Sequence, residues 1–331
     1  MSSVKLFISE YQNKIADLKS EDFENTALEL FAFQAKNCPI YSAFIKHLNI
    51  SISKINKIEN IPFLPIDFFK NHEVSSIKIK NPKYFLSSGT SHGTRAKHVI
   101  YNESFYHKNA QKGFEKIYGN LNDYLILALL PNYLDQGDSS LISMMSYFLK
   151  NSKHKESRFI NINKDEIERV LIQNKNQKTL LFGVSYALLS ISKNLHIPHS
   201  KLIVMETGGM KGRGKEIIRK TLHDQLSLAF PNNQIHSEYG MTELYSQAYS
   251  VGNGIFKPIH SMRVLCRSLQ DPFEILPNNQ SGALNIIDLA NTHSCAFIAS
   301  QDLGKTLNNN EFTVDGRASQ AAIRGCNLMD F

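Results

Sequence analysis

The chain has 331 residues, enough to bury a large core, and its 42% hydrophobic and 20% charged residues are typical of a globular protein rather than a disordered one. Its net charge of +7 comes from basic residues spread along the chain without interleaved stacking aromatics, so nucleic acid is not an expected partner. Four cysteines without a Cys-x-x-Cys pair argue against a disulfide framework or a zinc site. No segment resembles an export signal or is apolar enough to be transmembrane, and we therefore expect a cytoplasmic protein.

Residues 1–80 are expected to form a helical cap on the main body. A helix is predicted to start at Ser20, because two acidic residues follow in its first turn and apolar residues recur at helical spacing up to Phe31. The stretch from Ile61 to Pro65 carries two prolines, which favours an irregular crossing into the next unit. Helical character then resumes over Asp67–Lys70.

Residues 81–260 show the alternation of strand and helix that is typical of a parallel α/β core. Short continuous apolar runs predict strands that are covered on both faces. These runs are Tyr124–Leu130, Thr179–Phe182 and Leu202–Met205. Helices are predicted around and between them, at Ser139–Leu149, Tyr186–Asn194 and Lys215–Leu228.

The pattern changes after Ile235. Residues 261–317 carry strand-like segments without long helices between them, which predicts a β-rich subdomain, and residues 318–331 are expected to form a C-terminal tail. The strand-like segments are Met262–Cys266, Ala283–Asp288, Ala296–Ser300 and Phe312–Val314.

The segment from Tyr84 to Lys97 has the composition of a phosphate-binding loop. Its run of Ser and Thr is punctuated by Gly89 and Gly93, so hydroxyl and backbone N–H donors stand free of bulky side chains, and Arg95 adds positive charge together with Lys97. It is not a Walker A loop, because no Gly-Lys-Ser/Thr follows at the required spacing. Taken alone, this segment fits an ordinary surface turn as well as a triphosphate site.

A second segment, His236–Glu243, follows a strand-like lead-in. Its Tyr239 is suited to stacking on a purine, and Gly240 would permit close approach of the backbone. Thr242 and Glu243 are suited to contacting phosphate and magnesium. Alone it also fits a strand end that leads into a helix, so the pairing of the two segments carries the argument.

The two segments together resemble the adenylate-forming acyl-activating superfamily. Ser87–Lys97 is similar to its phosphate-binding signature and Tyr239–Glu243 to its adenine and magnesium signature. Asp302 stands where the superfamily keeps an Asp for the ribose hydroxyls, and Gly316-Arg317 resembles its hinge. The resemblance implies an α/β fold like the N-terminal domain of adenylate-forming enzymes. Its parallel-rich sheets would be flanked by helices, with a β-rich subdomain near the C-terminus and no full C-terminal catalytic domain.

The resemblance also implies a site for ATP and Mg²⁺, carried over residue by residue. A carboxylate would attack the α-phosphate of ATP, while donors and a metal meet the charge that builds on the phosphates. Lys97 and Arg317 would be catalytic, and Glu243 would bind the metal. The nucleotide-binding residues would be Ser87, Ser88, Gly89, Thr90, Thr94, Lys97, Gly208, Gly209, Tyr239, Gly240, Met241, Thr242, Asp302 and Arg317.

Within that superfamily the chain resembles the LuxE-type long-chain acyl-protein synthetases. The resemblance rests on Glu206–Gly212, Asn285–Asn291 and Ile323–Leu328 and covers most of the chain. It implies that a fatty acid becomes acyl-AMP and then a thioester on Cys326, with an acyl-accepting reductase or a carrier protein as partner. Two departures from the wider superfamily, Ala318-Ser319 after Arg317 and the lack of a domain with a catalytic Lys, put a domain-rotating mechanism with coenzyme A in doubt.

Three rival interpretations stay open at this stage. The acceptor could be coenzyme A or a carrier-protein thiol instead of Cys326, and the fold could serve a scaffold that binds nucleotide without catalysis. Gly183–Ala187 also hints at a nucleophile elbow, in which Ser185 would act with His196 or His236 in a serine hydrolase or acyltransferase. His92 and His98 lie beside the phosphate loop, and a structural role is expected for both.

Overall fold

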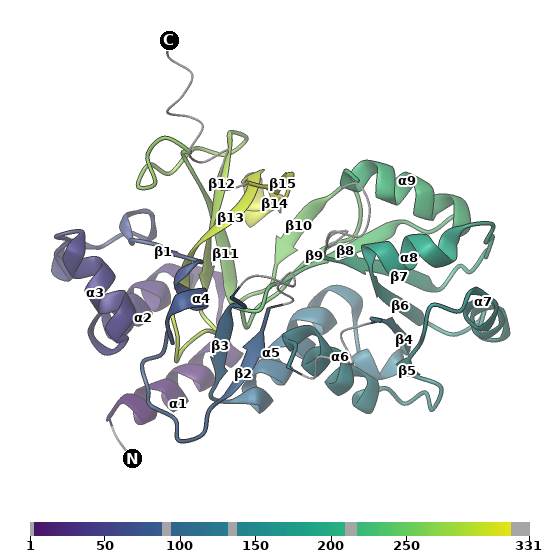
Figure 1. The fold of residues 1–331 in the computed structure, drawn as a ribbon, viewed down its shortest axis with the longest axis horizontal. Helices are drawn as coiled ribbons and strands as arrows, with labels where there is room; N and C mark the ends of the chain where they lie inside the picture. Colours follow the sequence, from purple (N-terminus) through teal and green to yellow (C-terminus); the bar gives the residue numbers. More distant parts are fainter. Residues whose placement is uncertain (1–2, 88–93, 132–137, 209–216, 319–331) are drawn as a thin grey trace, which may run out of the picture. The chain divides into compact units, whose positions relative to one another are not determined.

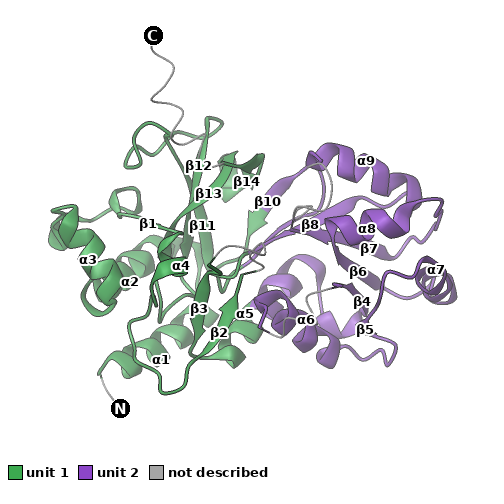
Figure 2. Cartoon of the chain, viewed as in Figure 1, with its two compact units in different colours: residues 1–109, 241–246, 257–331 green, residues 110–240, 247–256 purple. Residues whose placement is uncertain are grey.

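The computed structural model describes residues 3–87, 94–131, 138–208 and 217–318, which divide into two compact units (Figure 2). Unit 1 comprises residues 1–109, 241–246 and 257–331, and unit 2 comprises 110–240 and 247–256. Neither unit is a continuous stretch of chain, and the described parts of 1–80 and 261–317 fall in the same unit. Among the described helices, none is long and apolar enough to cross a bilayer.

Unit 1 combines N-terminal helices with an antiparallel sheet from the C-terminal third of the chain (Figure 1). Its helices are α1 (Ser3–Ala16), α2 (Phe23–Asn37), α3 (Pro39–His47), α4 (Phe68–Asn71) and the first part of α5 (Glu103–Tyr118). Its strands are β1 (Leu64–Pro65), β2 (Lys83–Leu86), β3 (Lys97–Ile100), β11 (Met262–Arg267), β12 (Ser281–Asp288), β13 (Phe297–Lys305), β14 (Phe312–Thr313) and β15 (Gly316–Arg317).

The sheet of unit 1 joins segments that are far apart in the sequence. Its strands run in the order β1-β13-β12-β11, with β15 also paired to β13. Strand β1 is parallel to β13, whereas β11, β12 and β13 are antiparallel neighbours. The rings of Phe31, Tyr41, Phe63 and Phe297 pack together, which fastens the N-terminal segment onto β13. Strands β2 and β3 form a separate antiparallel hairpin.

Unit 2 is a mostly parallel sheet with helices between its strands. In the order β9-β8-β7-β6-β4-β5, all neighbours are parallel except β8 and β9. Its strands are β4 (Leu125–Leu129), β5 (Arg158–Phe159), β6 (Thr179–Val184), β7 (Leu202–Thr207), β8 (Ile235–Tyr239), β9 (Ala248–Ser250) and the start of β10 (Ile255–Pro258). Its helices are the rest of α5, α6 (Ser140–Asn151), α7 (Lys164–Gln173), α8 (Ser185–Ser192) and α9 (Arg219–Ala229).

Helices cover both faces of this sheet. Neighbouring residues of β8 point to opposite sides: His236 contacts Tyr118 of α5, whereas Ser237 contacts His223 of α9. Burial on both sides explains why β4 consists entirely of apolar residues, and β6 is buried along its whole length. The parallel α/β architecture predicted for this part of the chain is therefore confirmed.

Most predicted elements appear close to their expected bounds, with three adjustments. Ser20–Asp22 is a 3₁₀ turn, and the α-helix begins only at Phe23. The crossing over Ile61–Pro65 contains the short strand β1, because Leu64 and Pro65 pair with β13. The helix predicted from Lys215 is described from Arg219 onward.

Candidate functional site

The described ends of the predicted phosphate loop are tied together at its base. Ser87 N–H donates to the Ala96 carbonyl at 3.0 Å, and Ala96 N–H donates back to Ser87 Oγ at 2.9 Å. Arg95 directs its guanidinium at the backbone, donating from Nε to the Ser87 carbonyl at 2.5 Å. The Arg95 guanidinium therefore binds the backbone of the hairpin. Lys97 is exposed to solvent. Ser88, Gly89 and Thr90 lie outside the described residues.

Unit 1 brings together three predicted site residues from widely separated positions. Arg317 Nε donates to Asp302 Oδ1 at 3.2 Å, because strands β13 and β15 place these two residues opposite each other. Both charges also act on the carboxyl group of Glu243, as does Lys70 of α4. The sequence analysis did not name Lys70 as a site residue and predicted only that it lies in a helical segment. Lys70 is also paired with Asp67 at 2.6 Å, so Glu243 lies near charges of both signs.

Glu243 is buried, and this burial raises the pKa of its carboxyl group to about 7. A hydrogen bond from its own backbone and the charges of Arg317 and Lys70 lower the pKa, whereas Asp302 raises it. Without a cation or a further donor, the Glu243 side chain therefore stays a protonated carboxylic acid up to about neutral pH. An approaching cation would stabilise the ionised form.

A magnesium ion at Glu243 would have to take most of its ligands from nucleotide phosphates and water. Among residues 3–87, 94–131, 138–208 and 217–318, no group of three or more His, Cys, Asp or Glu side chains forms a complete metal cage. Mg²⁺ in nucleotide enzymes is held by one or two carboxylates, with substrate phosphates and water as the remaining ligands. A single hard carboxylate such as Glu243 meets that requirement.

Thr242 and Met241 are half-buried and form the turn that precedes Glu243. Leu244 N–H donates to the Met241 carbonyl at 3.1 Å, which closes this turn. The Thr242 carbonyl lies 2.9 Å from His98 Nδ1, and the Glu243 carbonyl accepts from Asn291 Nδ2 at 2.9 Å. Two side chains of unit 1 thus fasten consecutive carbonyls of the motif. Sequence reasoning gave His98 a structural role and did not foresee Asn291 as its partner.

In unit 2, the predicted nucleotide residues lie at the carboxyl ends of β7 and β8. Gly208 adopts φ +68°, a conformation that favours glycine, and its carbonyl accepts from Ser185 Oγ at 2.9 Å. The ring of Tyr239 is buried against Phe256, with centroids 5.9 Å apart. Gly240 is exposed, and an added Cβ there would lie 2.5 Å from Glu238 Oε1. Gly209 lies outside the described residues.

Two buried glutamates at this edge of the sheet were not predicted. Burial raises the pKa of Glu238 to about 7, although Thr207 Oγ1 donates to its Oε2. For Glu206 burial also raises the pKa, but hydrogen bonds from His223 and Ser237 and the charge of Arg219 outweigh it and leave the pKa below its ordinary value. Open carboxyl ends of parallel strands are where α/β proteins bind ligands.

The environment of Ser185 does not resemble a catalytic triad. Its hydroxyl is buried and has two acceptors, Glu206 Oε2 at 3.1 Å and the Gly208 carbonyl at 2.9 Å. His236 Nδ1 instead faces Tyr118 Oη at 3.1 Å, and His196 is exposed. Among the described residues, no hydrogen bond links Ser185 to a histidine, which a Ser-His-Asp arrangement needs.

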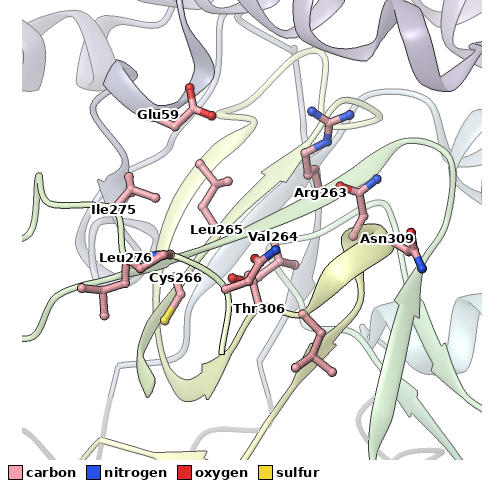
Figure 3. A pocket seen from close by; sticks show the side chains of 13 residues that line it. Glu59, Arg263, Val264, Leu265, Cys266, Ile275, Leu276, Thr306 and Asn309 are labelled. Carbon is pink, nitrogen blue, oxygen red and sulfur yellow. The ribbon is translucent and has the colours of Figure 1, made fainter. Parts of the chain in front are cut away.

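Two cavities lie away from these residues. Figure 3 shows the one in unit 1, about 390 Å³ in volume, beside strand β11. Its cation, Arg263, is already paired with Glu24 at 2.9 Å and stacked over Phe23 at 4.4 Å. The other cavity, about 780 Å³, lies between α8 and α9 of unit 2 and is lined in part by Leu189, Leu195 and Leu228. Neither includes a residue predicted to bind nucleotide.

No protein-family model matches the chain, and no curated protein matches it in sequence. Solved structures, however, resemble its fold. A 2-hydroxyisobutyryl-CoA ligase in complex with 2-HIB-AMP and CoA has a TM-score of 0.62 at 10% identity, covering 93% of this chain and 71% of that one. ATP-bound MatB from Rhodopseudomonas palustris has a TM-score of 0.51 at 14% identity, covering 71% of this chain and 47% of that one.

A third structure, McyG A-PCP complexed with phenylalanyl-adenylate, has a TM-score of 0.52 at 16% identity, covering 83% of this chain and 51% of that one. The chain thus spans about half the length of MatB and of the McyG structure. At such low identities the likeness concerns the fold. The predicted fold class is confirmed: the chain has an α/β fold that resembles the N-terminal domain of adenylate-forming enzymes.

Proposed function

We propose that the protein activates a carboxylic acid with ATP to form an acyl-adenylate and pyrophosphate. One observation carries this proposal: Glu243, Asp302 and Arg317, which the sequence resemblance assigned to one nucleotide site, are electrostatic neighbours within unit 1. The fold supports it, since the solved structures that it resembles carry ATP or an adenylate.

In the proposed first step, a carboxylate oxygen of the acid attacks the α-phosphorus of ATP, and the bond to pyrophosphate breaks. Negative charge builds on the phosphates, so donors near them lower the barrier. Lys97 is exposed at the start of β3 and would supply positive charge. The other proposed phosphate ligands are Ser87, Ser88, Gly89, Thr90, Thr94 and Thr242.

The remaining site residues would hold the nucleoside and the metal. Asp302 would accept hydrogen bonds from the ribose hydroxyls, and Arg317 would favour negative charge beside it. Bound Mg²⁺, held by Glu243, would neutralise phosphate charge and orient the leaving group. The residues proposed to line the adenosine are Gly208, Gly209, Tyr239, Gly240 and Met241.

In the proposed second step, the Cys326 thiolate attacks the acyl carbonyl carbon, a C–S bond forms and AMP leaves. A free thiol has a pKa of about 8.5, so only a few per cent is ionised at neutral pH, and Arg324, two positions earlier in the sequence, would increase that fraction. Both Cys326 and Arg324 lie outside the described residues. The LuxE-type resemblance favours a long-chain fatty acid as substrate and a reductase as the next acyl acceptor. Coenzyme A or a carrier-protein thiol is the alternative acceptor.

The first step is tested by ATP–pyrophosphate exchange with fatty acids of increasing chain length and with short, hydroxylated and amino acids. Acid-dependent exchange that requires Mg²⁺ is expected, with the fastest rate for one chain-length class. ATP binding without exchange for any acid would instead identify a scaffold that binds nucleotide. Loss of acyl transfer in Ser185→Ala, combined with no exchange in the wild type, would favour the serine hydrolase or acyltransferase.

The acceptor is tested by intact-mass spectrometry after incubation with ATP and the best acid. A mass increase equal to the acyl group is expected in the wild type and not in Cys326→Ser, whereas Cys266→Ser, which alters a buried thiol, should keep the adduct. If the wild type forms acyl-AMP but gains no mass, and added coenzyme A or carrier protein becomes acylated, the acceptor is that added thiol and not Cys326.

A further inference from the structure

His98 is a fully buried side chain in strand β3, immediately after Lys97. Its Nδ1 lies 2.9 Å from the carbonyl oxygen of Thr242, and its Nε2 lies 3.0 Å from Asn291 Oδ1. These partners are 144 and 193 positions away in the sequence. The imidazole therefore connects the strand after the phosphate loop to the turn that carries Glu243, within unit 1.

The orientation of Asn291 is fixed by its other contacts. Its Nδ2 donates to the carbonyls of Glu243 and Cys295, each at 2.9 Å. Both are pure acceptors, so a flipped amide would set oxygen against oxygen twice. Oδ1 must face His98. Both partners of His98 are therefore acceptors, and a neutral ring, with its single N–H, donates to one of them at a time, whereas only the imidazolium donates to both.

The ring of His98 has little freedom to leave this position. It stacks on His293, with centroids 5.6 Å apart and planes inclined by 4°, and it also contacts the rings of Phe69 and Tyr245. The neighbouring His293 has the same burial but a different bond, since its Nε2 lies 2.7 Å from the Val99 carbonyl. The two histidines thus form a natural pair of test and control.

We infer that His98 is a positioning residue, which holds the carbonyl of Thr242 against β3 and so fixes Thr242 and Glu243 in place beside the strand that begins with Lys97. The inference rests on the proposed function, in which Thr242 binds phosphate and Glu243 binds the metal, so that the position of this turn matters for catalysis. A displacement of about 1 Å in such groups costs on the order of a hundredfold in rate.

The two ring nitrogens can be tested separately by substitution. In His98→Asn the amide nitrogen takes the place of Nδ1 and keeps a donor for Thr242. In His98→Gln the amide reaches the place of Nε2 and keeps a donor only toward Asn291. His98→Met fills much of the ring volume and has no N–H donor, and His293→Met is the matched control at equal burial.

The experiment measures kcat and KM for ATP in acid-dependent pyrophosphate exchange, together with the melting temperature of each variant. His98→Met and His98→Gln should lose about 10- to 100-fold in kcat, with KM changing less than about threefold, whereas His98→Asn should recover most of the rate. His293→Met should lose stability but keep kcat within about threefold. Equal losses of kcat in both Met variants, or unchanged kcat in all His98 variants, would overturn the positioning role.

Hydrogen–deuterium exchange of the peptide over residues 241–246 separates this inference from the proposed function. Faster exchange is expected there in His98→Met than in His293→Met, whether or not the wild type catalyses pyrophosphate exchange. Equal exchange in the two variants refutes the positioning role even in an active enzyme. A wild type without activity but with this difference would refute the proposed function alone.

Discussion

Two buried carboxylates, one in each unit, are supported in contrasting ways. Asp288 of unit 1 accepts from the backbone N–H groups of Tyr245, Ser246 and Ala290 and from Ser246 Oγ, at 2.5–3.1 Å. Glu238 of unit 2 accepts a hydrogen bond from Thr207 Oγ1, and the negative charge of Glu206 raises its pKa further. Burial raises both pKa values, that of Asp288 to about 6 and that of Glu238 to about 7.

The difference teaches how a buried acid can be assigned a role. Four donors fill both oxygens of Asp288, and these bonds lower the pKa from what burial alone would give, so this group serves the fold of the turn after Glu243. Within the described part of the chain, Glu238 and Glu243 have fewer donors, and burial raises the pKa of each to about 7. Buried acids whose pKa values are raised, at strand ends and turns, are candidates for functional groups.

The largest effect is expected for Glu243→Gln, which keeps the shape and removes the charge. We expect a loss of about two to three orders of magnitude in pyrophosphate exchange, because the magnesium ion would lose the carboxylate that we propose as its ligand. Stability should not fall, since a buried charge is removed. Glu311→Gln, which removes an acid paired with Lys257 at 3.2 Å, is the control and should keep full activity. Full activity of Glu243→Gln would remove Glu243 from the site.

The next largest effect is expected for Asp288→Asn. Its amide would face backbone N–H donors on one side, so we expect a loss of about 2–4 kcal/mol in the free energy of unfolding. Urea denaturation at pH 7.5, where Asp288 is ionised, measures it. A loss below about 1 kcal/mol would contradict the structural role that separates Asp288 from Glu238.

Glu238→Gln, in contrast to Asp288→Asn, should raise the free energy of unfolding, and only at pH values above about 4.5. The folded protein holds this proton to about pH 7, whereas the unfolded chain releases it near the ordinary value of 4.5. The contribution of Glu238 to the stability of the wild type therefore falls as the pH rises from about 4.5 to about 7, and it stays at its lowest value above that. The variant should gain on the order of 1–3 kcal/mol at pH 8 and nothing at pH 4. A pH-independent difference would argue against a protonated Glu238.

The smallest effect on stability is expected for Arg317→Ala. Its side chain is 65% exposed, so the pair with Asp302 should contribute less than about 1 kcal/mol. Its effect on exchange should be larger, about tenfold, because we propose that its charge acts on the bound nucleotide. Thermal unfolding and exchange rates measured on the same sample separate the two. A variant with normal rates would leave Arg317 as a surface ion pair.

Strands and helices of unit 2 were predictable because burial on both faces leaves a local trace. The apolar runs over β4, β6 and β7 needed no knowledge of distant residues. Unit 1 is different: its sheet pairs β1 with β13, more than two hundred positions apart, and a two-residue strand such as Leu64–Pro65 leaves no periodic pattern. Each unit is built from separate stretches of the chain, and the sequence did not predict this, because it too depends on contacts between distant residues.

The candidate site was predictable where a motif specified it and not where tertiary contacts did. Glu243, Asp302 and Arg317 came from the resemblance, and their roles stay predictions. Glu238 and Asn291 lie within motif segments that the sequence analysis named, and Lys70 lies only in a predicted helical segment. The motifs assigned no role to any of the three, and their contacts come from distant neighbours. His98 was visible in the sequence, but its bond to Thr242 spans 144 positions.

The central claim, attack of a carboxylate on the α-phosphate of ATP, is tested most directly with an acid labelled with ¹⁸O in its carboxyl group. The account predicts that one ¹⁸O atom appears in AMP once the acyl group has left, because the attacking oxygen stays on the phosphorus. Label in inorganic phosphate with formation of ADP, or unlabelled AMP, would contradict it.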